Sequence, residues 1–398
     1  MVTLRGITWE HDRGYAPLEA AAKSYHDMHS EVAVVWKKRT LKEFGETQVD
    51  RLASEYDLVI VDHPFMELVA HANCFIPLET ILPRDFLHSQ AQESVGQSFH
   101  VYTYGGHQWA LAIDAAAQIS AYRPDLMPEP PTDWDMVLRV ARRFLDKQQS
   151  KVALPLSPAD CFCTFLTLCA NRGEPPFTHC GRVVSRSTAI DVLSYLSKLA
   201  RVVHPDSFDL NPPKTLERMS ETNEISYVPI LFGYSNYARS GYRSHLVRFT
   251  ALPSFGYGPI GSTLGGAGIA ISSTCRHVRE AADYVMWITK PEIQRTTYFD
   301  AGGQPGNRVA WLDVQVNRKS NNFFLDTWES MLTAYIRPRY LGFTQSQEEG
   351  GAIISKFLQE QGRPRNVLHK LDKLFLGTGK RRRTAKELIT PVGEEQAR

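Results

Sequence analysis

The sequence has no long hydrophobic run and no strong net charge. No stretch approaches the eighteen consecutive apolar residues of a transmembrane helix, so we expect no stable membrane insertion. The formal net charge is +2 over 398 residues, which gives no general attraction to nucleic acid or to a membrane surface. The chain contains 43% hydrophobic and 22% charged residues, values typical of globular proteins. A chain of this length exceeds one ordinary core, so we expect two lobes or domains.

Cysteine is scarce, and its spacing does not match the common cysteine-based sites. Four of the six cysteines are clustered, at Cys161, Cys163, Cys169 and Cys180, but they lack the paired C-x2-C spacing of a zinc site. We interpret them as small buried hydrophobic residues. A metal or redox role and a single disulfide are the alternatives.

Motifs for nucleotide, serine or metal chemistry are also missing. The glycine-rich run GSTLGGAGIAIS (261–272) has no following G-K-[ST] and leads into a strand, whereas a phosphate loop precedes a helix. Ser235 is not part of a G-x-S-x-G elbow. His11, His63 and His107 lie on different elements and have no H-E-x-x-H spacing. We therefore predict no catalytic residue, no metal and no cofactor.

The first 65 residues alternate between strand and helix patterns. Residues 3–9, 31–36 and 56–65 are apolar runs typical of buried strands, and residues 15–28 and 40–54 have helical patterns. Strands that are apolar almost throughout favour a mainly parallel sheet covered by helices. In such sheets ligands bind beyond the carboxyl ends of the strands. The sequence therefore predicts an α/β fold with a site at that edge.

Aromatic and polar side chains follow the first and third of these strands. Trp9, His11 and Arg13 lie at the end of the first strand, and Asp62 and His63 lie at the end of the third, where the run passes into a turn. An indole ring can stack on a flat ligand, and a guanidinium can bind two ligand oxygens at once. We predict that these five residues bind a ligand.

Further candidates lie later in the chain. Residues 107–114 are predicted as a strand that ends at Asp114 and is followed by a helix. The segment FGYSNYARSGY carries several rings beside hydrogen-bonding groups, a composition that suits a binding surface better than a core. The predicted ligand-binding residues of this part of the chain are Asp114, Tyr234, Asn236, Tyr237 and Gln304. Thr132 is expected to cap the next helix, with Asp135 three residues on.

In this order, the segments resemble the family 1 extracellular solute-binding proteins, the sugar-type substrate-binding components of ABC importers. The resemblance covers about residues 3–375 and rests on DLVIVDHPFMELVAHANCFIPLE (57–79), YGGHQWALAIDAAAQISAYRPDLM (104–127), PPTDWDMVLRVAR (130–142) and GGAGIAISSTCRHVREAADYVMWITKPEIQ (265–294). Two features depart from the family pattern: Ala112 stands where proline is usual, and the sequence as given has no signal peptide.

The resemblance implies a periplasmic-binding-protein-like fold of two α/β lobes, each a mainly parallel sheet flanked by helices, with a ligand cleft between them. It implies capture of a small polar ligand by hinge closure, and delivery to the permease subunits of an ABC importer. We expect lobe one over 1–113 and 256–305, lobe two over 114–255 and 306–376, and a flexible basic tail over 377–398. The expected protein is a monomer and not an enzyme. It is periplasmic by resemblance, or cytoplasmic if Met1 is the native start.

The sequence leaves the ligand and the role open. Stacking rings with Asp and Asn favour a carbohydrate, whereas Arg13 and two histidines also suit a small organic acid. A cytoplasmic ligand sensor and an enzyme built on the same scaffold are the alternative functions. Glu10, His11 and Asp62 at the predicted site are the residues that keep the enzyme alternative open.

Overall fold

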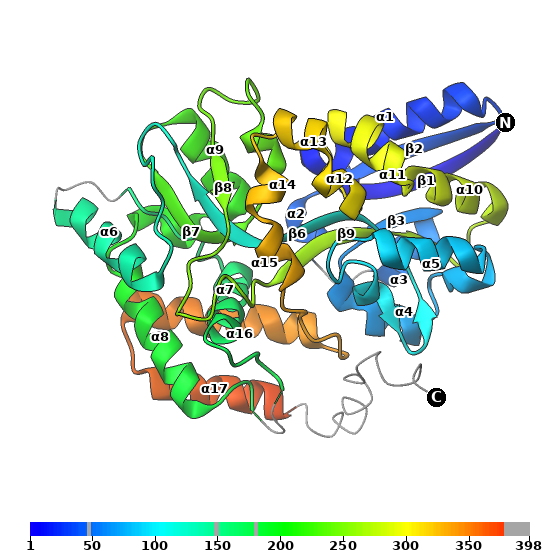
Figure 1. Ribbon diagram of the computed structural model, residues 1–398. Helices are drawn as coiled ribbons and strands as arrows, with labels where there is room; N and C mark the ends of the chain where they lie inside the picture. Colours follow the sequence, from blue (N-terminus) through cyan, green and yellow to red (C-terminus); the bar gives the residue numbers. More distant parts are fainter. Residues whose placement is uncertain (46–48, 147–150, 179–181, 378–398) are drawn as a thin grey trace, which may run out of the picture.

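A computed structural model describes residues 1–45, 49–146, 151–178 and 182–377, with side chains up to residue 375. Two α/β lobes lie side by side, and the chain passes between them several times (Figure 1). The expected two-lobed fold is therefore confirmed. The predicted tail lies outside the described residues except for Gly377. No described helix is long and apolar enough to span a membrane.

The sheet of lobe one begins with three parallel strands. The central strand β1 (Val2–Trp9) pairs with β2 (Val32–Arg39) on one side and β3 (Leu58–Val61) on the other. All four residues of β3 are buried, as its apolar sequence predicts. Beyond β3, the strands β9 (Leu264–Ile271) and β6 (Leu111–Tyr122) continue the sheet in antiparallel pairings. The first three strands are thus parallel as predicted, but the complete sheet is mixed.

The long strand β6 joins the lobes. Its first part pairs with β9, and its second part pairs with the lobe-two strands β7 (Tyr227–Phe232) and β8 (Arg248–Thr250), both antiparallel. We expected a mainly parallel sheet in lobe two, and this prediction is wrong for β6, β7 and β8, which pair antiparallel. The helix expected after Asp114 is also wrong. The alanines there remain extended because all twelve residues of β6 are buried between neighbouring strands.

The main strands of both lobes form one seven-stranded sheet, and helices pack around it in each lobe (Figure 1). Those of lobe one are α1 (Asp12–Met28), α2 (Leu41–Phe44), α3 (Val49–Glu55), α4 (Met66–Ala72), α5 (Arg84–Glu93), α10 (Val278–Ile288) and α11 (Pro291–Ile293). Those of lobe two are α6 (Trp134–Asp146), α7 (Pro158–Asn171), α8 (Arg186–Ala200), α9 (Pro212–Glu221), α16 (Phe343–Glu360) and α17 (Pro364–Gly377). Short elements are β4 (Thr103–Tyr104), β5 (His107–Gln108), η1 (His63–Phe65), η2 (Leu78–Thr80), η3 (His100–Tyr102), η4 (Pro205–Asp209), η5 (Ser235–Ala238) and η6 (Gln294–Tyr298).

Two local predictions in lobe two have different outcomes. Cys161, Cys163 and Cys169 are buried and free on α7, as expected for small hydrophobic residues, and Cys180 lies outside the described residues. The cap of α6 is Asp133, because its Oδ1 accepts a hydrogen bond of 2.6 Å from the backbone N–H of Met136. The predicted Thr132 cap is therefore wrong by one residue.

Four short helices connect the lobes before the chain continues into α16 and α17 of lobe two. They are α12 (Arg308–Leu312), α13 (Val314–Lys319), α14 (Phe323–Asp326) and α15 (Trp328–Leu332). In this group α12 contacts α11 of lobe one, whereas α14 contacts β8 of lobe two. Residue Tyr335, which follows, bridges to Thr263 just before β9. The two lobes are therefore linked through β6, through the entry to β9 and through the segment around residue 335.

Candidate functional site

A cleft of about 460 Å³ lies between the lobes. Lobe one contributes the turn from β1 to α1 and the end of β2, and lobe two contributes α9 and the loop after η5. The lobe-one contributions lie at the carboxyl ends of the parallel strands β1 and β2, where the sequence predicted a site. The lining residues are Glu10, His11, Asp12, Tyr15, Lys38, Pro213, Lys214, Glu217, Tyr237, Tyr242 and Arg243.

The first residues of the cleft are positioned by the start of α1. The His11 ring caps this helix by accepting a hydrogen bond of 3.0 Å from the backbone N–H of Arg13. The same ring lies 4.7 Å from the ring of Tyr234 in lobe two. Burial, together with the nearby Arg13 charge, lowers the pKa of His11 to about 4. At neutral pH the cleft therefore contains an uncharged imidazole.

The charged groups of the cleft balance one another. The lining holds three carboxylates and three cations, and most of them are paired. Arg243 Nε donates to Glu217 at 2.9 Å, and the Tyr237 hydroxyl donates to the same carboxylate at 3.0 Å. The hydroxyl of Tyr242 donates to Asp12 across the two lobes at 2.8 Å. The result is a lining without net charge that offers aromatic rings and many hydrogen-bonding atoms.

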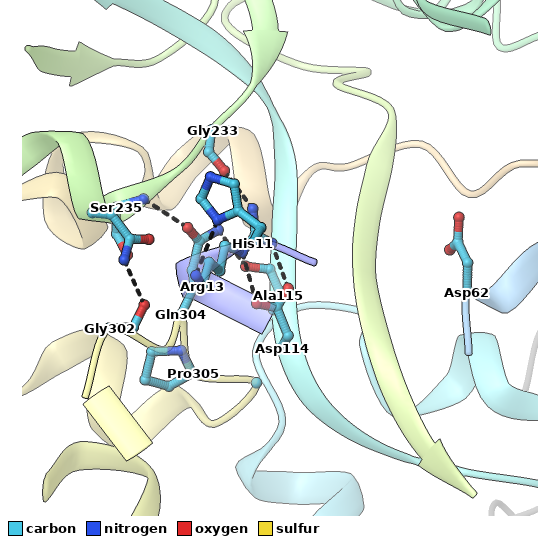
Figure 2. A network of polar contacts seen from close by, with 12 residues as sticks. His11, Arg13, Asp62, Asp114, Ala115, Gly233, Ser235, Gly302, Gln304 and Pro305 are labelled. Carbon is cyan, nitrogen blue, oxygen red and sulfur yellow. Dashed lines mark hydrogen bonds and ion pairs between the residues drawn. The ribbon is translucent and has the colours of Figure 1, made fainter. Parts of the chain in front are cut away.

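Behind the cleft, a buried ion pair joins α1 to β6. Arg13 Nε donates to Asp114 Oδ2 at 2.7 Å, a second guanidinium nitrogen donates to Oδ1, and Nη1 donates to the carbonyl oxygen of Gly233 at 2.8 Å (Figure 2). The guanidinium also lies 4.6 Å from the centre of the Tyr234 ring. Arg13 and Asp114 are 4% and 1% exposed. Burial raises the pKa of Asp114 although Arg13 opposes the shift.

The segment around η5 is held against lobe one by amide contacts (Figure 2). Gln304 donates to the carbonyl oxygen of Ala115 at 2.8 Å and accepts from the backbone N–H of Ser235 at 2.9 Å. Asn236 donates to the carbonyl oxygen of Gly302 at 3.0 Å. The structure therefore places Asn236 and Gln304 in contacts between the lobes.

Asp62 and His63 form a separate polar group. Arg337 donates to Asp62 Oδ2 at 2.8 Å, and its charge outweighs burial so that the pKa of Asp62 is lowered. His63 is fully buried, and burial lowers its pKa to about 4. Its Nδ1 lies 3.0 Å from Asp62 Oδ1, but neither ring nitrogen has a hydrogen-bonding partner among the described residues. Figure 2 shows Asp62 away from the group around Arg13.

The structure thus divides the ten predicted ligand-binding residues. His11 and Tyr237 line the cleft. Five residues form the network directly behind it: Arg13, Asp114, Tyr234, Asn236 and Gln304. Asp62 and His63 lie in the second polar group, and Trp9 packs in the core of lobe one with its ring 5.1 Å from that of Phe44.

Several cleft residues were not identified from the sequence. Glu217 lies on a polar helix and Arg243 lies in an irregular loop, and neither segment has a pattern that indicates a site. Tyr15 and Lys38 are residue types that are common at solvent-facing positions. Arg337 lies in a segment without periodicity, so nothing in the sequence placed it beside Asp62. The sequence feature that could have identified more of them is the Tyr-rich loop. Tyr242 and Arg243 of that loop line the cleft together with Tyr237.

No protein-family model matches the sequence. Solved structures do match the fold. Maltose-bound MalE3 of T. maritima aligns with a TM-score of 0.80 at 16% identity, over 94% of this chain and 100% of that chain. The GacH receptor of Streptomyces glaucescens aligns with a TM-score of 0.78 at 12% identity, over 95% and 98% of the two chains.

An ABC transporter solute-binding protein of Thermotoga lettingae, bound with alpha-D-tagatose, aligns with a TM-score of 0.76 at 15% identity, over 94% of this chain and 100% of that chain. Alignments that cover nearly all of both chains account for both lobes together. The resemblance inferred from the sequence is therefore confirmed at the level of the fold: this chain has the two-lobed fold of sugar-type solute-binding proteins of ABC transporters.

Proposed function

We propose that the chain is a solute-binding protein that captures a neutral carbohydrate or polyol between its lobes and delivers it to an ABC importer. The observation that carries the proposal is the interlobe cleft with three tyrosine rings and a lining of balanced charge. Rings cover the apolar faces of a sugar, and paired polar groups exchange hydrogen bonds with its hydroxyls. The solved structures with a similar fold include complexes with maltose, tagatose and ribitol.

The charges favour a neutral ligand over the small organic acid that the sequence left open. A carboxylate ligand needs a cation that is not already neutralised. Arg13 is paired with Asp114, Arg337 with Asp62, and Arg243 with Glu217. Lys38 of the lining is paired with Glu10, so Lys214 is the one lining cation without an ion pair among the described residues. A lysine is a point charge that does not bind two ligand oxygens in the manner of arginine, whereas sugar hydroxyls can join all the existing hydrogen-bonding groups.

Hinge closure is part of the proposal because both lobes supply the lining. A ligand that touches the β1–α1 turn and α9 at once binds the closed arrangement better than an open one, and this difference in affinity drives closure. The hydrogen bond from Tyr242 to Asp12 is one contact that exists only when the lobes are together. No catalytic role is assigned to Glu10 or His11.

A thermal-shift screen tests the proposal. Maltose, tagatose and ribitol would be compared with citrate and gluconate at equal concentrations. A ligand at 100 times its dissociation constant should add about 2.7 kcal/mol to the free energy of unfolding. We expect a raised melting temperature with at least one neutral compound of a wider saccharide and polyol panel. Stabilisation by the acids alone would refute the proposed ligand class.

A further inference from the structure

Three ionisable side chains meet at a contact between the lobes that lies outside the cleft lining. Asp62 and His63 follow β3 of lobe one, and η1, which begins at His63, contacts α16 of lobe two. Arg337 donates to Asp62 Oδ2 at 2.8 Å and to Oε1 of Gln347 on α16 at 3.3 Å. Its side chain is 6% exposed. One buried guanidinium therefore connects a carboxylate of lobe one to an amide of lobe two.

The His63 ring is placed to become a second cation for the same carboxylate. The ring is fully buried, and its Nδ1 lies 3.0 Å from Asp62 Oδ1, which accepts the backbone N–H of His63 at 2.8 Å. Among the described residues, neither ring nitrogen forms a hydrogen bond. A protonated imidazole carries a hydrogen on both nitrogens, so Nδ1 would then be a donor with a carboxylate oxygen within reach.

A charged His63 would give this contact an excess of positive charge. Asp62 is already paired with Arg337. The nearby Arg339 also disfavours a charge on His63, and in the described part of the chain it donates to backbone carbonyl oxygens and to no carboxylate. A protonated His63 would therefore be a third cation beside one carboxylate, in surroundings where charges interact strongly. Separation of Arg337 from Asp62 would relieve this excess.

Other titratable groups around His63 do not balance its charge. Tyr102 of η3 and Cys163 of α7 lie near the same contact, and burial raises the pKa of both, so they remain uncharged. Glu67 of α4 and Glu348 of α16 are on elements that contact η1. The charges that act most on His63 are nevertheless those of the contact itself.

We propose that Asp62, His63 and Arg337 form an acid-sensitive latch between the lobes. At neutral pH, Arg337 joins Asp62 to lobe two. When His63 takes up a proton from solvent, Asp62 gains a cation on its own lobe, Arg337 separates from it, and the lobes open. The latch rests on the hinge closure proposed above, but it does not depend on which ligand the cleft binds.

The direction of the pH dependence follows from the burial of His63. Burial lowers its pKa to about 4 while the lobes are closed, whereas a histidine in water has a pKa of about 6.5. Open lobes therefore bind the proton more tightly. The ratio of open to closed molecules should rise as the pH falls from about 6.5 to about 4, by at most about tenfold per pH unit for one histidine.

Small-angle X-ray scattering of the full chain without added ligand, at pH 7.5, 6.5, 5.5 and 4.5, tests the latch. Circular dichroism at each pH follows folding. We expect the closed arrangement at pH 7.5 and a larger radius of gyration at pH 4.5, with unchanged circular dichroism. His63→Gln should stay closed at every pH, and Arg337→Gln should be open already at pH 7.5. His107→Gln, a change at a half-exposed ring, should open like the parent protein.

An open parent protein at pH 7.5, or a radius of gyration that stays constant down to pH 4.5, would contradict the latch. The same acid opening in His63→Gln would also contradict it. If His63→Gln does not fold, Arg337→Gln decides, because a closed arrangement of that variant at pH 7.5 excludes the latch. Loss of circular dichroism along with the rise in radius would mean unfolding and not lobe opening, again against the proposal. Saccharide binding at pH 7.5 is measured separately, so failure of the latch is distinguishable from failure of the proposed function.

Discussion

At the scale of single residues, the interlobe region depends on charges that are buried in pairs. The pair Arg13–Asp114 also holds Gly233 of lobe two, so it supports the wall of the cleft and not only lobe one. A buried charge that loses its partner is costly, whereas removal of both charges is often nearly neutral. The sequence suggested Arg13 as a ligand contact because a guanidinium can bind two oxygens at once. In the structure these oxygens are those of Asp114, inside the protein.

Disruption of this pair should mainly affect stability. Arg13→Met or Asp114→Leu alone should lower the free energy of unfolding by about 3–5 kcal/mol, because the other charge is left buried and unpaired. The double variant should be more stable than the sum of the single losses predicts. Urea unfolding of the four proteins measures this coupling. Single variants that unfold like the parent protein would show that the pair is not formed in solution.

The buried histidines predict a dependence of stability on pH. The pKa values of His11 and His63 are about 4 in the folded chain and about 6.5 in the unfolded chain. Between these values the unfolded chain binds more protons, so the free energy of unfolding should fall as the pH is lowered from about 6.5 to about 4.

His63→Gln should reduce the slope of that decline, because one of the two titrating rings is removed. Chemical unfolding at pH 7, 6, 5 and 4.5 would measure it, with His107→Gln as the control at an exposed ring. Equal slopes for the parent protein and His63→Gln would contradict the burial of an uncharged His63.

At the scale of secondary-structure elements, β6 and β9 define how the lobes meet. Their register shifts between Ala112 and Asp114, and an irregularity of this kind re-aims the side chains beside it. Opposite this point, Gly266 of β9 has a φ of +111°, and a Cβ there would lie 2.9 Å from Cα of Ala115. The position of Asp114 behind the cleft therefore depends on close contact between these strands.

Gly266→Ala should separate the strands locally. Backbone strain of this kind costs about 1–3 kcal/mol, and the melting temperature should fall accordingly. Gly45→Ala is a matched control, since Gly45 has a φ of −79° and the nearest atom to a new Cβ is 3.5 Å away. Calorimetric melting of both variants gives the answer. Equal melting temperatures would mean that the two strands can move apart without cost.

The same strands show what the sequence could and could not predict. The apolar runs of β1 and β3 identified buried strands because burial on both faces leaves a continuous apolar pattern, whereas β2 is an edge strand whose residues alternate between buried and exposed. The alanines of β6 favour a helix when read alone, and pairing with strands far along the chain overrides that preference. The sequence around β6 gives no information about its partners β7 and β9. The single strand β6 was therefore predicted as a strand followed by a helix.

At the scale of the whole molecule, the position of the site was easier to predict than its residues. The edge of a parallel sheet follows from the order of strands, and the cleft lies there. Glu217 and Arg243 belong to the second lobe and reach the same cleft only after β6 and the later crossings bring the lobes together. Such a juxtaposition is a property of the fold and has no signature in spacing.

The central claim is that a sugar binds between the lobes. Its most direct test is a calorimetric titration with the saccharide that gives the largest thermal shift. We predict saturable binding to the parent protein and about tenfold weaker binding to Glu217→Gln, a loss of about 1.4 kcal/mol from altered hydrogen bonds. Glu129→Gln, an exposed change outside the cleft, should bind like the parent protein. Equal affinity in Glu217→Gln, or no saturable saccharide binding to the parent protein, would contradict the proposed site.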